Sequence, residues 1–508
     1  MSSYNVIVIG AGNAALCAAL SAQENGARVL VLERSPPAAR GGNSAHSGGA
    51  FRVVFNNLKE LRELMPDLAD DEVNNCEFGT YTKADYLEDM GRISEYQCDP
   101  DLAEVLADAS FDTAIWMRHI GARWLPPYGR QSSKVDGKNV FWGGVSIEAS
   151  GGGLGLMNAL FSAAEKRGID IKYEARALKL LTVGGVVCGV RVVQGGSEVD
   201  YHADAVVLAA GGFHANAEWR TRYLGKDWDL VKVRGNRFNT GDGIRMALDI
   251  GAIPWGNWSG CHSVFFDRNA PAFGDLDLLN QNKNGFSRGI VVNALGKRFM
   301  DEGADIRSYV YSQMGRRILE QPGRFGYQVF DQKIVPTLPD EYRTPKATRI
   351  EANTIEELAA KMEGVDSAAF VNTVREFNAA VSTEVPYNPA KKDGRCTSGL
   401  EINKSNWANR LDAPPFVAWG VTAGITFTYG GLRIDTEARV LSEDGPPDSK
   451  PLCDGRTGRW AVLHRISGRR WTDGRIGVRQ NRWSQRGHAL RRMRHIFVGE
   501  FQEKIKWV

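Results

Sequence analysis

The N-terminal segment of the chain carries a pattern that few folds accommodate. Residues 6–9 form an apolar run with β-branched side chains, which indicates a buried parallel strand. Gly10 and Gly12 follow at the spacing of a tight turn whose backbone N–H groups approach a pyrophosphate. Ala15 is small enough for the helix after the turn to pack on the strand. The sequence therefore predicts a dinucleotide-binding turn.

The segment after this turn completes the unit and ends in an acid. Residues 13–25 are predicted to form a helix that Gly26 ends, and residues 29–32 form the second strand. Glu33 follows directly, where a carboxylate accepts hydrogen bonds from a ribose diol. Glycine-rich helix starts also occur outside such sites, but strand, turn, helix, strand and acid occur here in order. We therefore expect an α/β fold with a Rossmann-like domain.

The length and composition of the chain narrow its class. With 508 residues it is too long for one ordinary core, so two domains are expected. No apolar run approaches the ~18 residues of a membrane span. The first predicted strand starts so early that it leaves no room for a signal peptide. The seven scattered cysteines lack paired metal-ligand spacing, and together these features predict a cytoplasmic protein with reduced thiols.

A glycine-rich loop follows the first βαβ unit. Its segments 41–44 and 48–49 would bring backbone close to a large planar ligand, although a flexible loop would have the same composition. Joined to the motif of residues 6–33, this loop resembles that of the succinate dehydrogenase/fumarate reductase flavoprotein family, where it holds FAD. Residues 204–213 resemble the family's strand that returns to the flavin, and residues 239–243 its turn beside the pyrophosphate.

The resemblance implies a set of residues around noncovalent FAD. Some family members attach FAD through a histidine in the early loop, at the place that Asn43 takes here. His46 lies three residues later, where we expect a loop or flavin-edge contact rather than a base. The FAD-binding residues that the resemblance implies are Gly10, Gly12, Ala14, Ala15, Glu33, Arg34, Gly41, Gly42, Asn43, Ser44, Gly48, Gly49, Ala177, Ala210, Gly211 and Asp242.

The middle of the chain resembles the family's capping domain, which closes over the substrate. Residues 246–415 show a mixed pattern of short strands and helices, so we expect an inserted α+β domain there. The FAD-binding domain is then discontinuous, with residues 1–245 and 416–445. Two helices in the insertion are indicated by a capping box at Thr354 and by amphipathic spacing over residues 367–381.

One arginine is the main catalytic candidate. Residues 289–302 resemble the family's strand and turn beside the active site, after which the family carries an arginine that transfers a proton at the substrate carbon. Arg307 takes that place, one residue later than in fumarate reductases. It could instead bind a substrate carboxylate through its bidentate fork, or be structural. His262 is the candidate for the family's substrate-binding histidine, with a structural histidine as the alternative.

The segment near residue 428 departs from the fumarate reductase pattern. Thr426 and Thr428 stand where those enzymes place a carboxylate-binding histidine. This variant resembles the FAD-dependent tricarballylate dehydrogenases of the same family, which oxidise a propane-tricarboxylate to cis-aconitate by hydride transfer to flavin N5. The resemblance implies a small polycarboxylate substrate and a membrane-associated electron-transfer partner at the inner membrane. A fumarate reductase, a 3-ketosteroid dehydrogenase and the flavoprotein of cobalamin ring contraction are the alternatives.

The last residues of the chain break the pattern abruptly. Residues 446–508 hold 15 Lys and Arg against 5 Asp and Glu, and show no helical or strand period. Codons compatible with these residues, read one base later, encode the family's Thr-Gly-Glu turn and glycine-rich helix start in order. We therefore expect a frameshift near residues 445–447, which would make the chain as written an inactive remnant. The alternative, a basic tail for nucleic acid or membrane, lacks any binding motif, so no nucleic-acid partner is expected.

Overall fold

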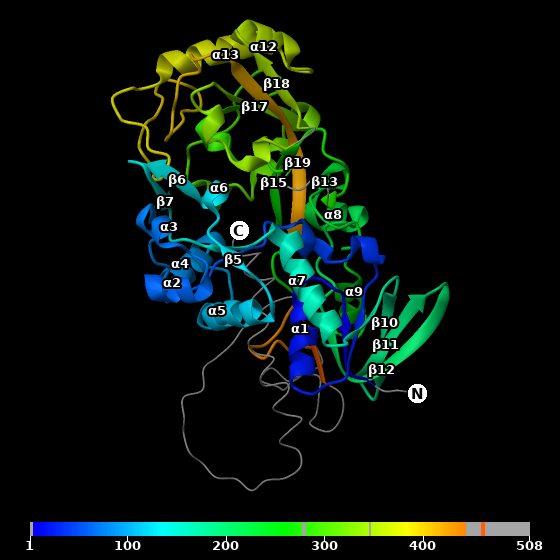
Figure 1. The fold of residues 1–508 in the computed structure, drawn as a ribbon. Coiled ribbons are helices and arrows are strands. Elements are labelled where there is room, and N and C mark those ends of the chain that lie inside the picture. Colours follow the sequence, from blue (N-terminus) through cyan, green and yellow to red (C-terminus); the bar gives the residue numbers. More distant parts are fainter. Residues whose placement is uncertain (1–3, 277–280, 345–346, 443–458, 463–508) are drawn as a thin grey trace.

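The computed structural model consists of two sheet-centred parts, stacked one above the other in the view of Figure 1. The lower part is built mainly from the N-terminal half of the chain, and the upper part from the segments coloured green to orange. The residues that the structure describes are 4–276, 281–344, 347–442 and 459–462.

The larger sheet is the predicted Rossmann-like unit. β1 (Tyr4–Ile9) lies between β2 (Val29–Leu32) and β12 (Ser197–Leu208) and runs parallel to both. The side chains of Val6 to Ile9 and those of β2 are all buried, as expected for a strand covered on both faces. Further strands of this sheet are β9 (Asp170–Lys172), β10 (Arg176–Val183), β11 (Val186–Gln194) and β21 (Arg459–Val462).

The turn after β1 requires glycine. Gly10 has a φ of +106°, and a Cβ there would lie 2.4 Å from the carbonyl oxygen of Ala209, which follows β12. Helix α1 (Asn13–Glu24) then starts at the edge of the sheet and buries most of its length. The backbone of two strands and one helix start is therefore brought close together, as a cofactor phosphate site requires.

The sequence pattern predicts a hairpin strand over residues 198–202 and a separate strand over residues 204–213, whereas β12 joins the two. The structure has one continuous strand, because its pairing partner changes near Ala203 without a turn. Ser197 to His202 pair antiparallel with β11, and from Ala203 onward the strand pairs in parallel with β1. This strand carries the chain from the exposed hairpin directly to the edge of the sheet where Ala210 and Gly211 lie.

The second sheet is organised around one long strand. β19 (Phe416–Thr428) is buried along nearly its whole length and hydrogen-bonds to four other strands. Its partners are β13 (Lys232–Val233), β15 (Cys261–Asp267), β17 (Phe325–Phe330) and β18 (Arg349–Ala352), and β16 (Ile290–Asn293) pairs with β17. The return of the chain to the FAD-binding domain at residue 416 stays a prediction. β19, which begins at that residue, forms its backbone hydrogen bonds within the upper sheet.

Helices cover both sheets. α12 (Ile355–Lys361) and α13 (Ser367–Ala380) lie at the top of the upper part in Figure 1, and the Thr354 side chain accepts a hydrogen bond from Glu357 N as predicted. Within the described residues, none of the helices is both long and apolar enough to cross a bilayer. The remaining α-helices are α2 (Leu58–Leu64), α3 (Asp70–Asn74), α4 (Lys83–Ile93), α5 (Pro100–Ile120), α6 (Tyr128–Gln131), α7 (Gly152–Lys166), α8 (Ala217–Leu224), α9 (Asp242–Leu248), α10 (Arg307–Val310) and α11 (Met314–Leu319).

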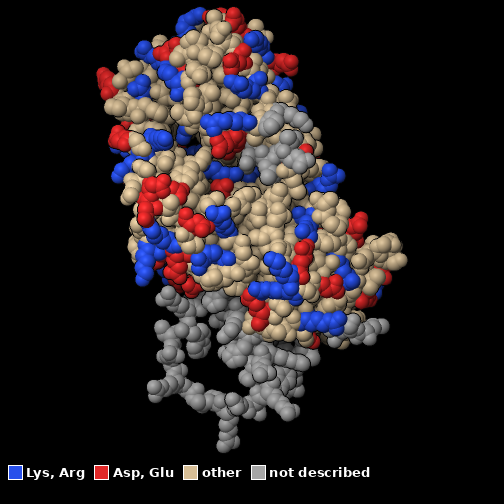
Figure 2. Space-filling model, viewed as in Figure 1, with Lys and Arg blue, Asp and Glu red and all other residues tan. Residues whose placement is uncertain are grey.

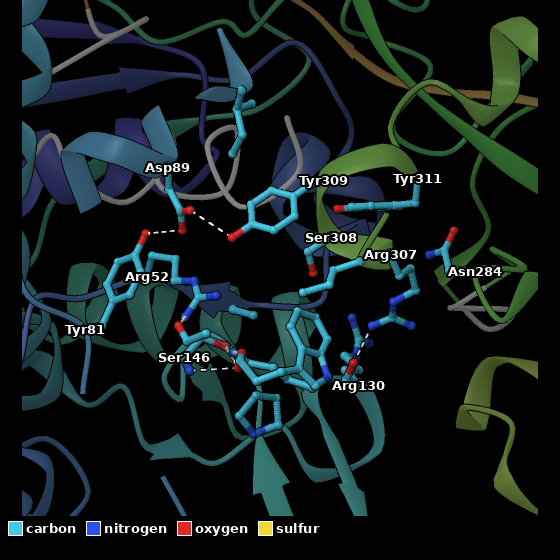
Figure 3. A pocket seen from close by; sticks show the side chains of 17 residues that line it. Arg52, Tyr81, Asp89, Arg130, Ser146, Asn284, Arg307, Ser308, Tyr309 and Tyr311 are labelled. Carbon is cyan, nitrogen blue, oxygen red and sulfur yellow. Dashed lines mark hydrogen bonds between the residues drawn. The ribbon is translucent and has the colours of Figure 1, made fainter. Parts of the chain in front are cut away.

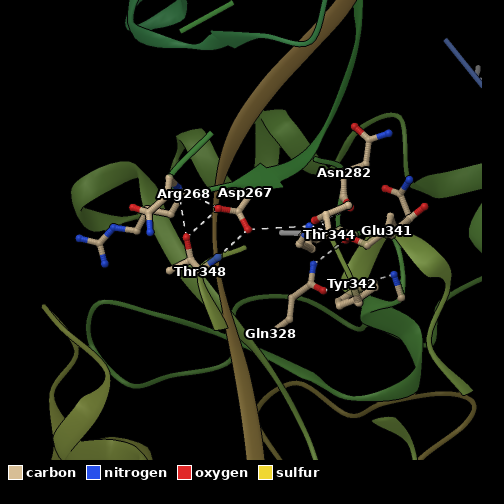
Figure 4. Close-up of polar contacts among 12 residues, drawn as sticks. Asp267, Arg268, Asn282, Gln328, Glu341, Tyr342, Thr344 and Thr348 are labelled. Atoms are coloured by element: carbon tan, nitrogen blue, oxygen red, sulfur yellow. Dashed lines mark hydrogen bonds and ion pairs between the residues drawn. The ribbon is translucent and has the colours of Figure 1, made fainter. Parts of the chain in front are cut away.

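A buried polar network anchors residues 283–285 to the upper sheet (Figure 4). Lys283 Nζ lies 3.8 Å from the Asp267 carboxylate, and both side chains are fully buried. Asp267 also accepts hydrogen bonds from Thr348 N and Oγ1, at 2.9 and 2.7 Å. Lys283 Nζ donates to the carbonyl oxygen of Glu341 at 2.8 Å. Because both charges are paired and hydrogen-bonded, their burial is tolerated.

The same network fixes Asn284, which faces two cavities of the protein. Gln328 on β17 donates to the carbonyl oxygen of Lys283 at 2.7 Å, and the Tyr342 hydroxyl donates to the Gln328 side chain. Gly285 N in turn donates to the Tyr342 hydroxyl at 2.7 Å. The backbone on either side of Asn284 is therefore anchored to the sheet.

We expect Lys283→Met to lower the free energy of unfolding by about 3–5 kcal/mol, because it leaves the Asp267 carboxylate buried without its cation. Urea denaturation measures this loss. Lys83→Met is the matched control, since Lys83 pairs with Glu104 and Asp108 at 2.8 Å but is partly exposed. That change should cost less than about 1 kcal/mol. Equal losses in the two variants would contradict the role assigned to the buried pair.

Candidate functional site

A cavity of about 620 Å³, here called the nucleotide cavity, lies at the carboxyl ends of β1 and β2. Open α/β sheets bind their ligands at this edge. It is bordered by the starts of α1 and α9 and by the beginning of β10. The structure brings ten of the predicted FAD-binding residues to its wall, namely Gly10, Gly12, Glu33, Arg34, Gly42, Asn43, Ala177, Ala210, Gly211 and Asp242.

The other predicted FAD-binding residues do not line this cavity. Ala14 and Ala15 are buried in α1. Ser44 Oγ accepts a hydrogen bond from Asn13 N at 3.1 Å, which ties the glycine-rich loop to the helix start. Gly49 approaches the backbone of Gly152 at the start of α7 so closely that a Cβ would lie 2.4 Å from it. Gly41 and Gly48 likewise belong to this loop and do not line the nucleotide cavity.

Glu33 is held as an acceptor at the cavity wall. Its carboxylate accepts hydrogen bonds from Ala11 N at 2.8 Å and from Ser35 N at 2.7 Å. Burial raises the pKa of Glu33, while the hydrogen bonds from Ser35 and Ala11 oppose this shift. A carboxylate has about four lone-pair sites. Glu33 therefore keeps acceptor capacity for a ribose diol after both backbone bonds are made.

Asp242 is held between two arginines. Arg34 Nη1 lies 3.0 Å from its carboxylate, and Arg176 Nε lies 3.2 Å from the same oxygen. Arg34 also donates to Thr240 Oγ1 at 2.6 Å. The sequence indicated Asp242 as an FAD-binding residue but did not indicate Arg176, which carries no motif of its own. The pairing orients the carboxylate and places positive charge beside the cavity.

The residues present fit a polar dinucleotide. The side-chain oxygens of Asn43 and Asn239, both cavity-lining residues, are buried and have no hydrogen-bond partner among the described residues. An unmet buried acceptor is costly, so donors on a bound molecule would satisfy these two. Asn43 is held in place, since its Nδ2 donates to the carbonyl oxygen of Thr426 at 3.1 Å. The backbone turn at Gly10 and Gly12 adds the cradle for phosphate.

A second cavity, here called the arginine cavity, has a volume of about 850 Å³ and contains Arg307 (Figure 3). Arg52 and Arg130 line it as well. Arg52 Nη1 donates to the carbonyl oxygens of Gly143 and Gly144 at 2.9 and 2.6 Å. Arg307 Nη2 donates to the carbonyl oxygen of Arg130. Three guanidinium groups from distant parts of the sequence therefore meet around one space.

Two tyrosines and an acid close one end of the arginine cavity. Tyr81 and Tyr309 both donate to Asp89, at 2.7 and 3.0 Å, as Figure 3 shows. Burial raises the pKa of Tyr309 to about 12, and the Asp89 carboxylate adds to this shift. Tyr309 is thus a protonated hydroxyl at neutral pH. This end of the cavity is therefore polar, and its acid, Asp89, already accepts hydrogen bonds from both tyrosine hydroxyls.

The segment that carries Arg307 is tied to helix α4. Arg92 on α4 forms an ion pair with Asp305, and its guanidinium lies 3.9 Å from the centre of the Tyr309 ring. The bond from Tyr309 to Asp89 joins the same helix. Lys392 lies 3.5 Å from Asp305 on the other side. These contacts, here called the α4 latch, hold the start of α10 over the arginine cavity.

The other catalytic candidates do not line the arginine cavity. His262 is fully buried, with its ring centre 4.9 Å from that of Phe427 and 5.3 Å from that of Tyr311. Burial and then the charge of Arg234 hold the pKa of His262 well below its ordinary value, so it is neutral. Thr428 Oγ1 accepts a hydrogen bond from Phe213 N at 3.2 Å. His262 and Thr428 therefore do not share a cavity with Arg307.

These residues lie between the two cavities. The backbone of Thr426 contacts Asn43 of the nucleotide cavity, and His262 contacts Tyr311 of the arginine cavity. His46 lies near the same junction, where Arg234 donates to its carbonyl oxygen at 3.3 Å. Burial, with the Arg234 charge, lowers the pKa of His46 to about 4, so its imidazole is neutral at pH 7, and its expected role as a loop or flavin-edge contact stays a prediction.

Sequence reasoning missed most of the arginine cavity. Arg52, Tyr81, Asp89 and Arg130 lie in a stretch without a recognisable chemical motif. Their convergence depends on long-range packing between the helical group and the upper sheet, which no spacing rule reveals. A cluster of arginine and tyrosine in this stretch was the available signal, but it gave no means of pairing these residues with Arg307.

Comparison with known proteins agrees with this geometry. A family model described as FAD binding domain matches residues 5–448. The fumarate reductase (cytochrome) of Shewanella frigidimarina is 27% identical, with 87% of this chain and 69% of that protein covered. The 4-oxocyclohexanecarboxylate 2-dehydrogenase of Sinomonas cyclohexanicum is 29% identical, with 88% of this chain and 86% of that protein covered.

The fold is also that of a solved flavoprotein. The open conformation of a flavocytochrome c3 fumarate reductase superposes with a TM-score of 0.68 at 23% identity, covering 100% of this chain and 79% of that one. The family match spans far more than half of the chain. The protein therefore belongs to the FAD-binding-domain family, and it is an FAD-dependent oxidoreductase of the succinate dehydrogenase/fumarate reductase flavoprotein type.

Proposed function

We propose that the protein oxidises a CH–CH bond of a small polycarboxylate, and that this substrate is tricarballylate, which becomes cis-aconitate. The observation that carries the proposal is the convergence of Arg52, Arg130 and Arg307 on one cavity. Guanidinium groups bind carboxylates through paired N–H donors. Arg130 is paired with Glu148, but Arg52 and Arg307 have no carboxylate within 4.0 Å among the described residues, so a polyanion fits this cavity better than a neutral ketosteroid does.

The direction of the reaction rests on different support. Among the relatives, one is named a fumarate reductase and another a dehydrogenase of a cyclohexanecarboxylate. Thr426 and Thr428 replace the histidine that the fumarate reductase pattern carries, and this favours the dehydrogenase. The second candidate is the reverse chemistry, reduction of an unsaturated dicarboxylate, which the fumarate reductase relatives support.

The chain's own residues would bind, orient and move a proton. FAD, when bound, supplies the acceptor for the hydride that leaves one carbon. Arg52 and Arg130 hold carboxylates, which positions the C–C bond and stabilises negative charge that develops on it. Arg307 is the group proposed to take the proton from the neighbouring carbon, at a guanidine nitrogen that has first released its own proton to solvent, so that the step regenerates the cation. Free arginine is a poor base, so its fixed position decides its activity more than its pKa does.

The cofactor and partner form further parts of the proposal. FAD is bound without a covalent link, because Asn43 occupies the loop position at which some relatives attach it. A membrane-associated electron carrier reoxidises the flavin, and the enzyme itself is cytoplasmic and reaches the inner membrane through that carrier. We expect His262, Thr426 and Thr428 to act indirectly, from their place between the two cavities, and not by direct contact with the substrate.

Anaerobic mixing of tricarballylate with FAD-loaded protein, expressed from a gene whose frame is restored near residue 446, tests the function. We expect bleaching of the flavin absorbance and formation of cis-aconitate, while succinate and a 3-ketosteroid cause little bleaching. Bleaching by succinate alone would favour the fumarate reductase alternative. A reduced flavin that fumarate reoxidises, with no response to tricarballylate, would overturn the proposal.

Arg307→Lys should lower kcat by roughly 10²- to 10⁴-fold, the range typical of a lost acid or base, because Lys cannot place a planar donor pair at the same point. Steady-state rates and flavin content measure the effect, and FAD binding should not change. Arg317→Lys is the control, since Arg317 is an exposed residue of α11 outside both cavities. A loss below threefold in Arg307→Lys would exclude a proton-transfer role.

Asp305→Asn should lower kcat roughly 10- to 100-fold with unchanged FAD content, because the α4 latch no longer fixes Arg307 within the needed distance. The double variant Arg92→Asp with Asp305→Arg reverses the charges and should recover part of the rate. Pre-steady-state bleaching measures both. If the single variant retains the full rate, the latch does not position Arg307.

The aberrant tail gives a separate prediction. Residues 446–508, except 459–462, lie outside the described residues, and the frameshift stays a proposal from the sequence. We expect a gene with the frame restored near residue 446 to yield protein with about one FAD per chain, because the Thr-Gly-Glu turn is regained. The chain as written should purify with little FAD. Equal flavin content in the two proteins would contradict the frameshift.

A further inference from the structure

A third cavity of about 950 Å³, here called the outer cavity, adjoins the arginine cavity. The two share Arg130, Trp142, Asn284, Ile306 and Arg307 as lining residues. The outer cavity continues from these toward α6 on one side and toward the upper part of the molecule on the other. Figure 2 shows a hollow in this area, with blue side chains at its edge.

The outer cavity has more positive than negative charge. Five cations and one acid line it, namely Arg130, Arg288, Arg307, Arg343, Lys391 and Asp340. Asp340 forms an ion pair with Arg343, which also donates to the carbonyl oxygen of Pro336 at 3.1 Å. Arg130 lies 3.4 Å from the Glu148 carboxylate. The one acid of the cavity is therefore already engaged, and the excess positive charge is concentrated on the other arginines.

Arg288 and Arg307 have no carboxylate within 4.0 Å among the described residues. Arg288 is only partly exposed, and it donates to the carbonyl oxygen of Thr337 and to Ser133 Oγ, the latter at 3.4 Å. Burial and the charge of Arg307 lower the pKa of Arg288, with Tyr387 opposing the shift. A guanidinium has five N–H donors, so Arg288 retains unused donors.

We propose that Arg288 binds an additional carboxylate of the substrate, in the outer cavity next to Arg307. This proposal rests on the proposed function and names the residue that selects a tricarboxylate over a dicarboxylate. An anion between Arg288 and Arg307 removes the repulsion of two like charges and fills their free donors. A dicarboxylate is bound by the arginines of the arginine cavity alone and leaves Arg288 without a carboxylate partner.

Calorimetric titration of the full-length, frame-restored and FAD-loaded protein with propane-1,2,3-tricarboxylate and with succinate tests the proposal. We expect Arg288→Gln to weaken tricarboxylate binding at least tenfold and to leave succinate binding within twofold. Arg288→Lys keeps the charge and should show an intermediate loss, because it lacks the planar donor pair. Lys391→Gln removes one charge from the same cavity at an exposed position and should change either affinity less than twofold. Thermal unfolding checks that each variant is folded.

The outcomes separate this proposal from the proposed function. Equal weakening of both ligands, or no weakening of either, would overturn a specific role of Arg288. If the wild-type protein binds neither ligand, the proposed function fails, and titration with inorganic sulfate then tests the anion subsite itself. Sulfate binding that Arg288→Gln abolishes would support the subsite, and absence of sulfate binding to the wild-type protein would overturn it.

Discussion

The hydrogen bonding of β19 is the interaction on which the rest of the structure depends. This strand is buried in the upper sheet and pairs with four others, so it cannot shift without breaking several ladders. Its last residues stay paired with β15 and also contact the lower part, where the carbonyl oxygen of Thr426 accepts a hydrogen bond from Asn43 and Thr428 Oγ1 accepts one from Phe213 N. The nucleotide cavity and the arginine cavity are thus held in a fixed relation by one continuous piece of backbone.

Electrostatics explains why the site needs both parts of the molecule. Arg52 and Arg130 come from the lower part, while Arg288 and Arg307 come from the segment around β16. Bringing cations together is unfavourable unless packing and hydrogen bonds oppose it. Carbonyl oxygens provide this opposition here, at Gly144 for Arg52 and at Thr337 for Arg288. Carbonyls bind a guanidinium without cancelling its charge, so the cavities remain attractive to polyanions.

The local elements were predictable because their signals are short in range. The apolar run before Gly10, the small residue at Ala15 and the acid at Glu33 each act within one βαβ unit, and β2 has the predicted bounds of 29–32. The helix over residues 367–380 follows its amphipathic spacing in the same way. β12 was divided wrongly, because its change of partner at Ala203 depends on β1, a strand far away in sequence.

The sequence by itself determined the nucleotide-binding unit, the class of fold and the candidate Arg307, since each depends on residue types at fixed spacing. Only the tertiary structure decided which arginines meet Arg307 and that His262 and Thr428 do not line the arginine cavity. The physical reason is that a motif specifies local backbone shape, whereas a charged cavity needs side chains that packing brings together. Arg52, Arg130 and Arg288 carry no motif in the sequence, and they line adjoining cavities only because the tertiary structure brings their segments together.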